Sequence, residues 1–272
     1  MKNDCYYYLS VEETQKIALE IMKTLHSYCV EHNLRYCLAW GTLLGAIRHK
    51  GFIPWDNDMD IFMSRKDIKK LLHLNKKKPI SSNIQLLSYC SDDNYHYTVV
   101  RACDNRTTVS PSYLRHKIKD LGIWVDIVPL DGFNGVFYLL QKPIIFFYQK
   151  ILNAIIYKIP PEKKIKKFLQ KIIVRLFSDN NHKYERIIDS VSQWSNYDQS
   201  QMVTVFNESD CTPISQLMSR KDFENSFLTE FEDACFFIPQ NADKILTATY
   251  GDYMQLPPEN ERQTHDIKAR WI

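Results

Sequence analysis

Acidic residues gather where a polar turn meets an apolar stretch. The segment from Asp56 to Met63 is DNDMDIFM, which places Asp58 and Asp60 two residues apart at the start of a predicted strand. Residues two apart on a strand point to the same side, so the two carboxylates are expected to lie together. They repel each other unless a cation lies between them. The spacing predicts a site for Mg²⁺ or Mn²⁺, hard cations that prefer oxygen ligands. An acidic turn without a ligand is the structural alternative.

A third carboxylate lies inside an apolar run. Asp126 stands alone in IWVDIV, residues 123–128, which has the pattern of a buried strand. A buried carboxylate without a partner is costly, so we expect Asp126 to share the cation with Asp58 and Asp60. An ion pair with an arginine is the alternative. Asp131 is expected to cap the turn at Gly132.

Groups that could hold phosphate lie beside these acids. Gly41 and Thr42 precede a predicted helix, residues 42–49, whose first amides are suited to bind a phosphate, with Thr42 as the helix cap. A plain helix cap is the alternative. Arg48 and Arg101 are expected to neutralise the charge of a diphosphate leaving group, whereas ordinary surface cations are the alternative for them.

The surrounding pattern predicts an α/β fold, in the sense of an α+β mixed sheet. A capping box at Ser10 and Glu13 opens a helix that runs to about residue 33, and Ser64 is expected to cap another. Strands are predicted at 35–40, 59–63, 84–89, 95–103, 123–128 and 231–238, and helices over 135–194 and 242–250. We divide the chain into a catalytic core (1–134), a helical, basic insertion (135–200) and a C-terminal segment that completes the core (201–272).

Composition narrows the class of protein. The 272 residues carry a net charge of +3, too small to indicate nucleic-acid binding, and 44% are hydrophobic, as in globular proteins. The seven cysteines form no CxxC pair, and no secretory signal is recognised, so a reduced, cytoplasmic chain is expected. A zinc site from Cys90, His96 and Cys103 is the less favoured alternative.

The insertion combines apolar and basic residues. Between residues 141 and 175 there are nine Lys or Arg and one Glu, a local charge of +8. Lys142, Pro143 and Lys150 interrupt the apolar run, which argues against a membrane-spanning helix. The pattern favours a helix in the interface of an anionic membrane, on the inner face of the cell membrane. Helices packed on the core with a solvated basic face are the alternative.

Three motifs together resemble the LicD family, whose relatives include fukutin and fukutin-related protein. They are GTLLGAIRHKGFIPWDNDMDIFM from Gly41, WVDIVPLDG from Trp124, and YGDYMQLPP from Tyr250, which is followed by Arg262 and His265. The resemblance implies a nucleotidyltransferase-like fold and a metal site at Asp58, Asp60 and Asp126. Asn57 departs from the aspartate often found in the family, and Arg101 stands where many members have lysine.

The resemblance also implies a reaction. A phospho-alcohol, most simply phosphocholine, would pass from a CDP-alcohol donor to a sugar of a bacterial surface glycan, such as lipopolysaccharide, teichoic acid or capsule, with release of CMP. The acceptor could be lipid-linked. His265 is expected to reach the substrate from the C-terminal segment. A nucleotidyltransferase that releases pyrophosphate and a non-catalytic scaffold for polysaccharide assembly remain the alternatives.

Overall fold

A mixed sheet forms the centre of the protein. The computed structural model describes residues 7–111, 113–159, 163–177, 181–206, 217–262, 264 and 268–272. In this part of the chain the main sheet has the strand order β1-β2-β6-β4-β3, and β7 and β8 extend it from the end of β6. Strands β2 and β6 are parallel, and the other pairs are antiparallel. The strands of this sheet are β1 (Tyr36–Leu38), β2 (Met59–Ser64), β3 (Ile84–Leu87), β4 (Val100–Asp104), β6 (Trp124–Phe133), β7 (Met202–Thr204) and β8 (Met218–Ser219). The predicted α/β (α+β mixed sheet) fold is confirmed.

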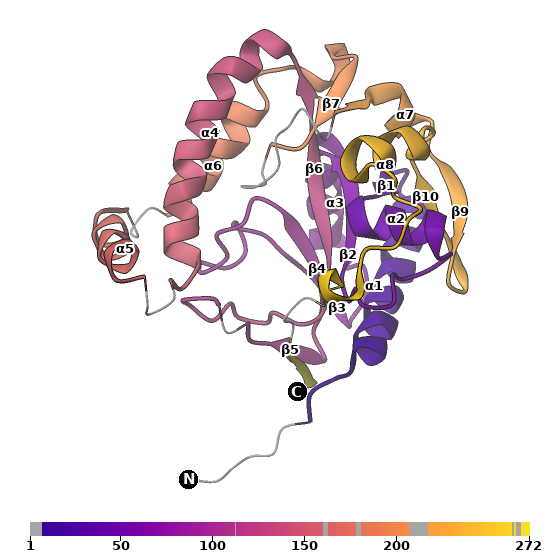
Figure 1. Ribbon diagram of the computed structural model, residues 1–272, viewed down its shortest axis with the longest axis horizontal. Coiled ribbons are helices and arrows are strands. Elements are labelled where there is room, and N and C mark those ends of the chain that lie inside the picture. The colour runs from indigo at the N-terminus through magenta and orange to yellow at the C-terminus, as the bar shows by residue number, and fades with distance from the viewer. Residues whose placement is uncertain are drawn as a thin grey trace.

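Helices flank this sheet, and two short sheets complete the fold (Figure 1). The helices are α1 (Val11–Glu31), α2 (Trp40–Arg48), α3 (Arg65–Lys77), α4 (Gly135–Ile156), α5 (Lys164–Phe177), α6 (Lys183–Ser192), α7 (Arg220–Glu224) and α8 (Ala242–Tyr250). The short sheets pair β9 (Phe227–Phe231) with β10 (Ala234–Ile238), and β5 (Thr107–Val109) with β11 (Ala269–Trp271). Figure 1 shows α4 and α6 together on the side of β6 away from α1.

Helix α1 anchors the core. Ser10 and Glu13 form the predicted capping box, which satisfies two of the free amides at the helix start. Apolar residues then recur at helical spacing and are buried, among them Ile17, Ile21 and Leu25. Burial of each such side chain contributes about 1.5–3 kcal/mol. The helix packs on β2, β4 and β6, and it therefore fixes the strands that carry the predicted acids.

The two faces of the central strands bury different clusters. Met59 and Ile61 of β2 belong to the large core that includes α1, whereas Phe62 belongs to a smaller cluster with Val128 of β6. Because side chains alternate along a strand, Asp60 and Asp126 share the face of Phe62 and Val128. The acids therefore lie on the face opposite α1, where the smaller apolar cluster ends.

Some predicted boundaries are wrong. Strand β6 continues to Phe133, because its last three residues pair with β7. Asp131 therefore caps no turn: it is buried within β6, and its Oδ1 lies 2.5 Å from Nε of Arg65. The predicted strand at 231–238 is a hairpin, and β4 begins only at Val100.

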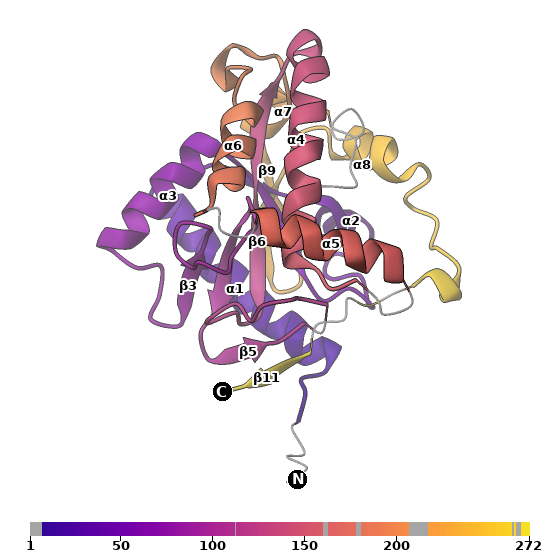
Figure 2. The ribbon, with the colours of Figure 1, turned by 90° about the vertical axis from the view of Figure 1, so that its left-hand side faces the viewer.

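In the described part of the predicted insertion, three helices follow β6. Helix α4 packs against α6, and the side chain of Gln170 ties α5 to α4 by donating to the carbonyls of Ala154 and Tyr157. Figure 2 shows α5 on the outside of the molecule, lying across one end of α4. No helix in the described ranges is long and apolar enough to cross a membrane.

Candidate functional site

Three charged residues form a row across neighbouring strands. Asp60 of β2 is in register with Asp126 of β6, and Asp126 is in register with Arg101 of β4. Residues in register on adjacent strands have their side chains on the same face. Asp58 precedes β2 by one residue and stands two before Asp60, on the same side. The sheet therefore brings together the three carboxylates that the sequence predicted to act together.

Asp126 is held by two donors. Arg101 Nε donates to its Oδ1 and Trp124 Nε1 donates to its Oδ2, each at 2.8 Å. The ion pair is largely buried, with 12% of the Arg101 side chain and 16% of the Asp126 side chain exposed. The arginine pairing that the sequence left open as an alternative is thus present. It fixes the orientation of the carboxylate and leaves lone pairs on both oxygens for another ligand.

Aromatic rings enclose Arg101. Its guanidinium carbon lies 4.3 Å from the centre of the Trp124 ring and 4.6 Å from that of Tyr97, with Tyr95 at 5.8 Å. Burial lowers the pKa of Arg101, but Asp126 and the tyrosines more than offset this effect and hold the pKa above its usual range. Arg101 is therefore a permanent cation whose position is fixed by stacking. These rings were not predicted from the sequence, although Tyr95 and Tyr97 alternate in YHYTVVR and such alternation indicates side chains on one side.

The carboxyl of Asp58 shows the electrostatic strain of the cluster. Burial raises its pKa well above the usual value, and the charges of Asp56 and Asp126 and a hydrogen bond with Asp56 raise it further, while Arg101 opposes them. A carboxyl in such surroundings ionises fully only when a cation compensates its charge. The donor set of aspartate oxygens fits a hard divalent cation. Asp56 was not among the predicted ligands, although the sequence DNDMD places it beside them.

The loop before β2 is held from several sides. Gln15 of α1 donates to the carbonyl of Asp56 at 2.6 Å. A side-chain carbon at Gly45 would lie 2.4 Å from the carbonyl oxygen of Gly51, so only glycine allows α2 to pack against this loop. The Phe52 amide donates to Glu232 Oε1 from the β9–β10 hairpin at 3.0 Å. These contacts set where the acidic loop enters the sheet.

Gly41 and Thr42 lie at the start of α2, beside the acids. The prediction that Thr42 caps this helix is wrong. Helix α2 begins at Trp40, and Ala39 is its cap residue, without a side-chain hydrogen bond. The buried hydroxyl of Thr42 instead accepts a hydrogen bond from the Asp60 amide at 2.9 Å. A side-chain carbon at Gly41 would lie 2.8 Å from Asp56 Oδ2. Both residues thus border the acidic cluster, and their contact with phosphate stays a prediction.

Arg48 contacts the C-terminal segment. Its Nη1 donates to the carbonyl of Tyr253 at 2.6 Å, and burial lowers its pKa. A pocket of about 470 Å³ lies here, lined by residues that include Arg48, Trp55 and Tyr250. The guanidinium carbon of Arg262 lies 5.0 Å from the centre of the Trp55 ring at this end of the chain. The predicted substrate residue His265 lies outside the described residues.

Another pocket, of about 620 Å³, lies away from the charged row. It is lined by residues of α1, α3 and the hairpin, including Cys29, Lys70 and Phe237. It contains none of the predicted site residues, and its size alone gives no reason to place the chemistry there. The pocket of about 470 Å³ includes Arg48, but Asp58, Asp60 and Asp126 line neither pocket.

Comparisons with known proteins identify a family model and several similar chains. A model of the family described as LicD/FKTN/FKRP, nucleotidyltransferase domain, matches residues 33–140. The chain is 26% identical to the lipopolysaccharide cholinephosphotransferase LicD of Haemophilus influenzae, over 97% of this chain and 98% of that protein. It is also 28% identical to the uncharacterized protein RP689 of Rickettsia prowazekii, over 49% of each chain. It is 31% identical to the uncharacterized protein RT0683 of Rickettsia typhi, over 48% of this chain and 40% of that one.

The matched region coincides with the candidate site. Residues 33–140 contain Gly41, the row of Asp60, Asp126 and Arg101, and the preceding Asp58. The similarity to the Haemophilus protein continues through the insertion and the C-terminal segment. The chain therefore resembles the LicD family, by the family model over residues 33–140 and by the Haemophilus protein over nearly its whole length.

Proposed function

We propose that the protein transfers phosphocholine from CDP-choline to a sugar of a bacterial surface glycan and releases CMP. The observation that carries the proposal is the row of Asp60, Asp126 and Arg101, with Asp58 beside it, on one face of the sheet. The similarity to a lipopolysaccharide cholinephosphotransferase along nearly the whole chain supports phosphocholine as the group transferred and lipopolysaccharide as the type of acceptor.

Asp58, Asp60 and Asp126 would hold Mg²⁺ or Mn²⁺. The raised pKa of Asp58 supports this assignment, because the cluster is unfavourable without a compensating cation. A bound divalent cation would supply charge neutralisation for the donor diphosphate.

In the reaction, an oxygen of the acceptor sugar forms a bond to the phosphorus that carries choline. The bond from that phosphorus to the bridging oxygen breaks, CMP leaves, and the hydroxyl proton passes to a base or to solvent. Such transfers depend mainly on positioning and charge stabilisation. Arg101, fixed by Asp126 and the aromatic rings, adds permanent positive charge beside the acids. Because Asp126 is paired with Arg101, we assign it to ligand binding rather than to proton transfer.

A nucleotidyltransferase that releases pyrophosphate is the second candidate. The family model that matches residues 33–140 is described as a nucleotidyltransferase domain, and the same carboxylates would serve that reaction. The decisive experiment incubates the protein with Mg²⁺, purified glycan and CDP-choline, CDP-ethanolamine, CDP-glycerol or CDP-ribitol, and measures CMP and the mass of the glycan. We expect CMP and a glycan heavier by one phosphocholine. Pyrophosphate from CTP, without CMP from any CDP-alcohol, would establish the second candidate instead.

We also propose that the α4–α5 region contacts an anionic membrane at the cytoplasmic face. Along α5 the apolar residues recur at helical spacing on one exposed side: Ile165, Phe168, Leu169, Ile172 and Leu176, from 42% to 78% exposed. Lysines occupy the other side, and Gln170 is the buried residue of the helix. An exposed apolar face next to lysines is typical of a helix in a membrane interface. This placement would bring the enzyme to acceptors carried on lipid.

Liposome sedimentation tests the contact. We expect binding to vesicles with anionic lipid, weaker binding in salt, and loss of binding when Lys166 and Lys167 are changed to Gln, since each basic residue near such a surface contributes about 1 kcal/mol. The matched control changes Lys76 and Lys77, which are exposed at the end of α3. Equal binding of both variants, or no binding by the wild type at low salt, would reject the membrane contact.

A further inference from the structure

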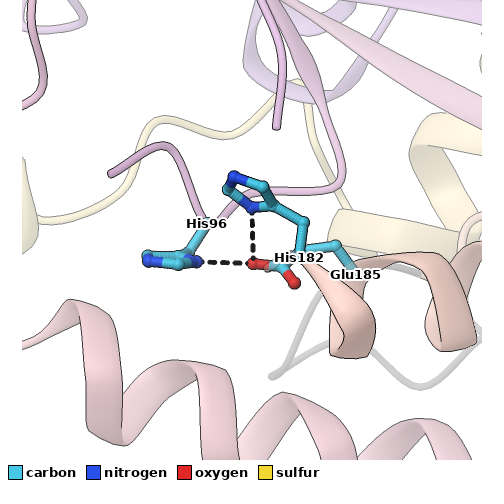
Figure 3. Close-up of side chains that lie close together, drawn as sticks. All are labelled: His96, His182 and Glu185. Carbon is cyan, nitrogen blue, oxygen red and sulfur yellow. Dashed lines mark hydrogen bonds and ion pairs between the residues drawn. The ribbon is translucent and has the colours of Figure 1, made fainter. Parts of the chain in front are cut away.

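Two histidines and a glutamate meet away from the charged row. His96 precedes β4, His182 lies at the start of α6, and Glu185 lies in the first turn of that helix. Nδ1 of His96 is 2.6 Å from Glu185 Oε1, and Nδ1 of His182 is 3.4 Å from the same oxygen (Figure 3). One carboxylate oxygen therefore faces two imidazole nitrogens that come from different parts of the chain.

The cluster is buried. The side chains of Glu185, His182 and His96 are 0%, 7% and 11% exposed. Among the residues that the structure describes, Oε2 of Glu185 is buried without a hydrogen-bond partner. A buried carboxylate with one oxygen unsatisfied calls for a further electrophilic partner.

The conformation of His182 directs its ring toward Glu185. This residue is the N-cap of α6, yet its side chain accepts no hydrogen bond from the helix amides. Its backbone is left-handed, with φ of 56°, which is uncommon for residues other than glycine. The ring is thus used for the cluster and not for capping the helix.

We propose that His96, His182 and Glu185 bind a divalent transition metal ion of the zinc type. Imidazole nitrogen and carboxylate oxygen are ligands of such ions. Bond lengths of about 2.0–2.1 Å in a tetrahedron place ligand atoms about 3.3 Å apart. One ligand atom from each residue lies within 4.8 Å of the others, so small side-chain movements suffice. Water would complete the tetrahedron.

The ion would link the insertion to the charged row. His96 stands between Tyr95 and Tyr97, whose rings lie over Arg101. A metal bound to His96 and to α6 would fix the segment around His96. It would therefore also fix the rings of Tyr95 and Tyr97 that lie over Arg101. The site would differ in kind from the aspartate cluster, because its nitrogen ligands favour zinc over magnesium. His96, His182 and Glu185 would then act as positioning residues.

Titration of the apo protein with Co²⁺, followed by its visible spectrum, tests the proposal. Cobalt in a tetrahedral site absorbs strongly in the visible range, whereas octahedral cobalt at aspartates absorbs weakly. We expect the wild type to bind one equivalent with a tetrahedral spectrum and without thiolate charge-transfer bands, and Zn²⁺ to displace it. An absent tetrahedral spectrum, or thiolate bands, would overturn the proposal.

Variants locate the ion. Glu185→Gln retains the size of the side chain. Both Glu185→Gln and His182→Gln should weaken cobalt binding by more than roughly 10–100-fold, which is the loss expected when a residue that only supports a metal ligand is changed. His73→Gln changes an exposed histidine of α3 and should give the wild-type tetrahedral spectrum. Asp60→Asn should give the same tetrahedral spectrum, because it removes a ligand only from the aspartate cluster. Circular dichroism confirms the fold of each variant. Unchanged cobalt binding in a folded Glu185→Gln protein would place the ion elsewhere and refute the site, and the wild-type spectrum decides the case if neither variant folds.

Discussion

Replacement of Asp58 by asparagine should separate catalysis from stability. Asn keeps the size of the side chain but removes one of the three carboxylates proposed to hold the divalent cation. Because charge stabilisation of this kind is preorganised by the fold, we expect transfer to fall by about a hundredfold or more. The protein should nevertheless fold, since Asp58 lies at the edge of β2 and the buried strand residues are unchanged.

The same change should stabilise the metal-free protein at neutral pH. The folded state raises the pKa of Asp58 well above its ordinary 3.8, chiefly by burial and by the charge of Asp56. The folded protein therefore retains this proton to higher pH than the unfolded chain, and stability falls as pH rises from about 4 through the raised pKa. A pKa raised by one unit corresponds to about 1.4 kcal/mol. The variant should therefore have a higher Tm than the wild type, and each 1 kcal/mol of the gain raises Tm by about 2–4 °C in a chain of roughly this size.

Thermal unfolding in EDTA at a series of pH values measures this effect. The gain of the variant over the wild type should be present at pH 7 and should disappear below about pH 4, where Asp58 is protonated in both states. Added Mg²⁺ should raise the Tm of the wild type more than that of the variant. A variant less stable than the wild type at pH 7 in EDTA would contradict the electrostatic account of the cluster.

Three further changes test how the site is supported. Arg101→Gln should lower kcat/KM by about a hundredfold, because Asp126 loses its ion pair. Arg101→Lys retains the charge and should lower kcat/KM less. Steady-state kinetics with CDP-choline would measure both effects. Arg65→Gln leaves the buried carboxylate of Asp131 and the partly exposed one of Asp189 without their shared cation. It should lower the free energy of unfolding in urea by about 3–5 kcal/mol. Gly45→Ala forces α2 away from the backbone carbonyl of Gly51. It should lower the free energy of unfolding by about 1–3 kcal/mol and reduce activity, as measured by urea unfolding and steady-state kinetics.

Local patterns in the sequence predicted the acidic strands but not the partners that lie far along the chain. Alternating acidic residues and apolar runs predicted the strands β2 and β6. In the structure these strands are parallel neighbours, and Asp60 is therefore aligned with Asp126. Asp131 was misassigned because the pairing of β6 with β7 depends on residues some seventy positions later. The aromatic cover of Arg101 and the cluster around Glu185 likewise depend on tertiary contacts, which spacing alone does not reveal.

The two interpretations of Asp126, ion pair and metal ligand, are compatible. A carboxylate offers about four lone pairs, and Arg101 and Trp124 each use one, on different oxygens. The donors come from β4 and from β6 itself, while Asp60 approaches from β2 on the other side. Arg101 lowers the energy of the ionised form and holds the carboxylate in one orientation, so that the remaining lone pairs are directed before a cation arrives. Arg101 would therefore prepare the proposed metal site rather than compete with the cation, and the aromatic rings around it hinder its movement toward the other acids.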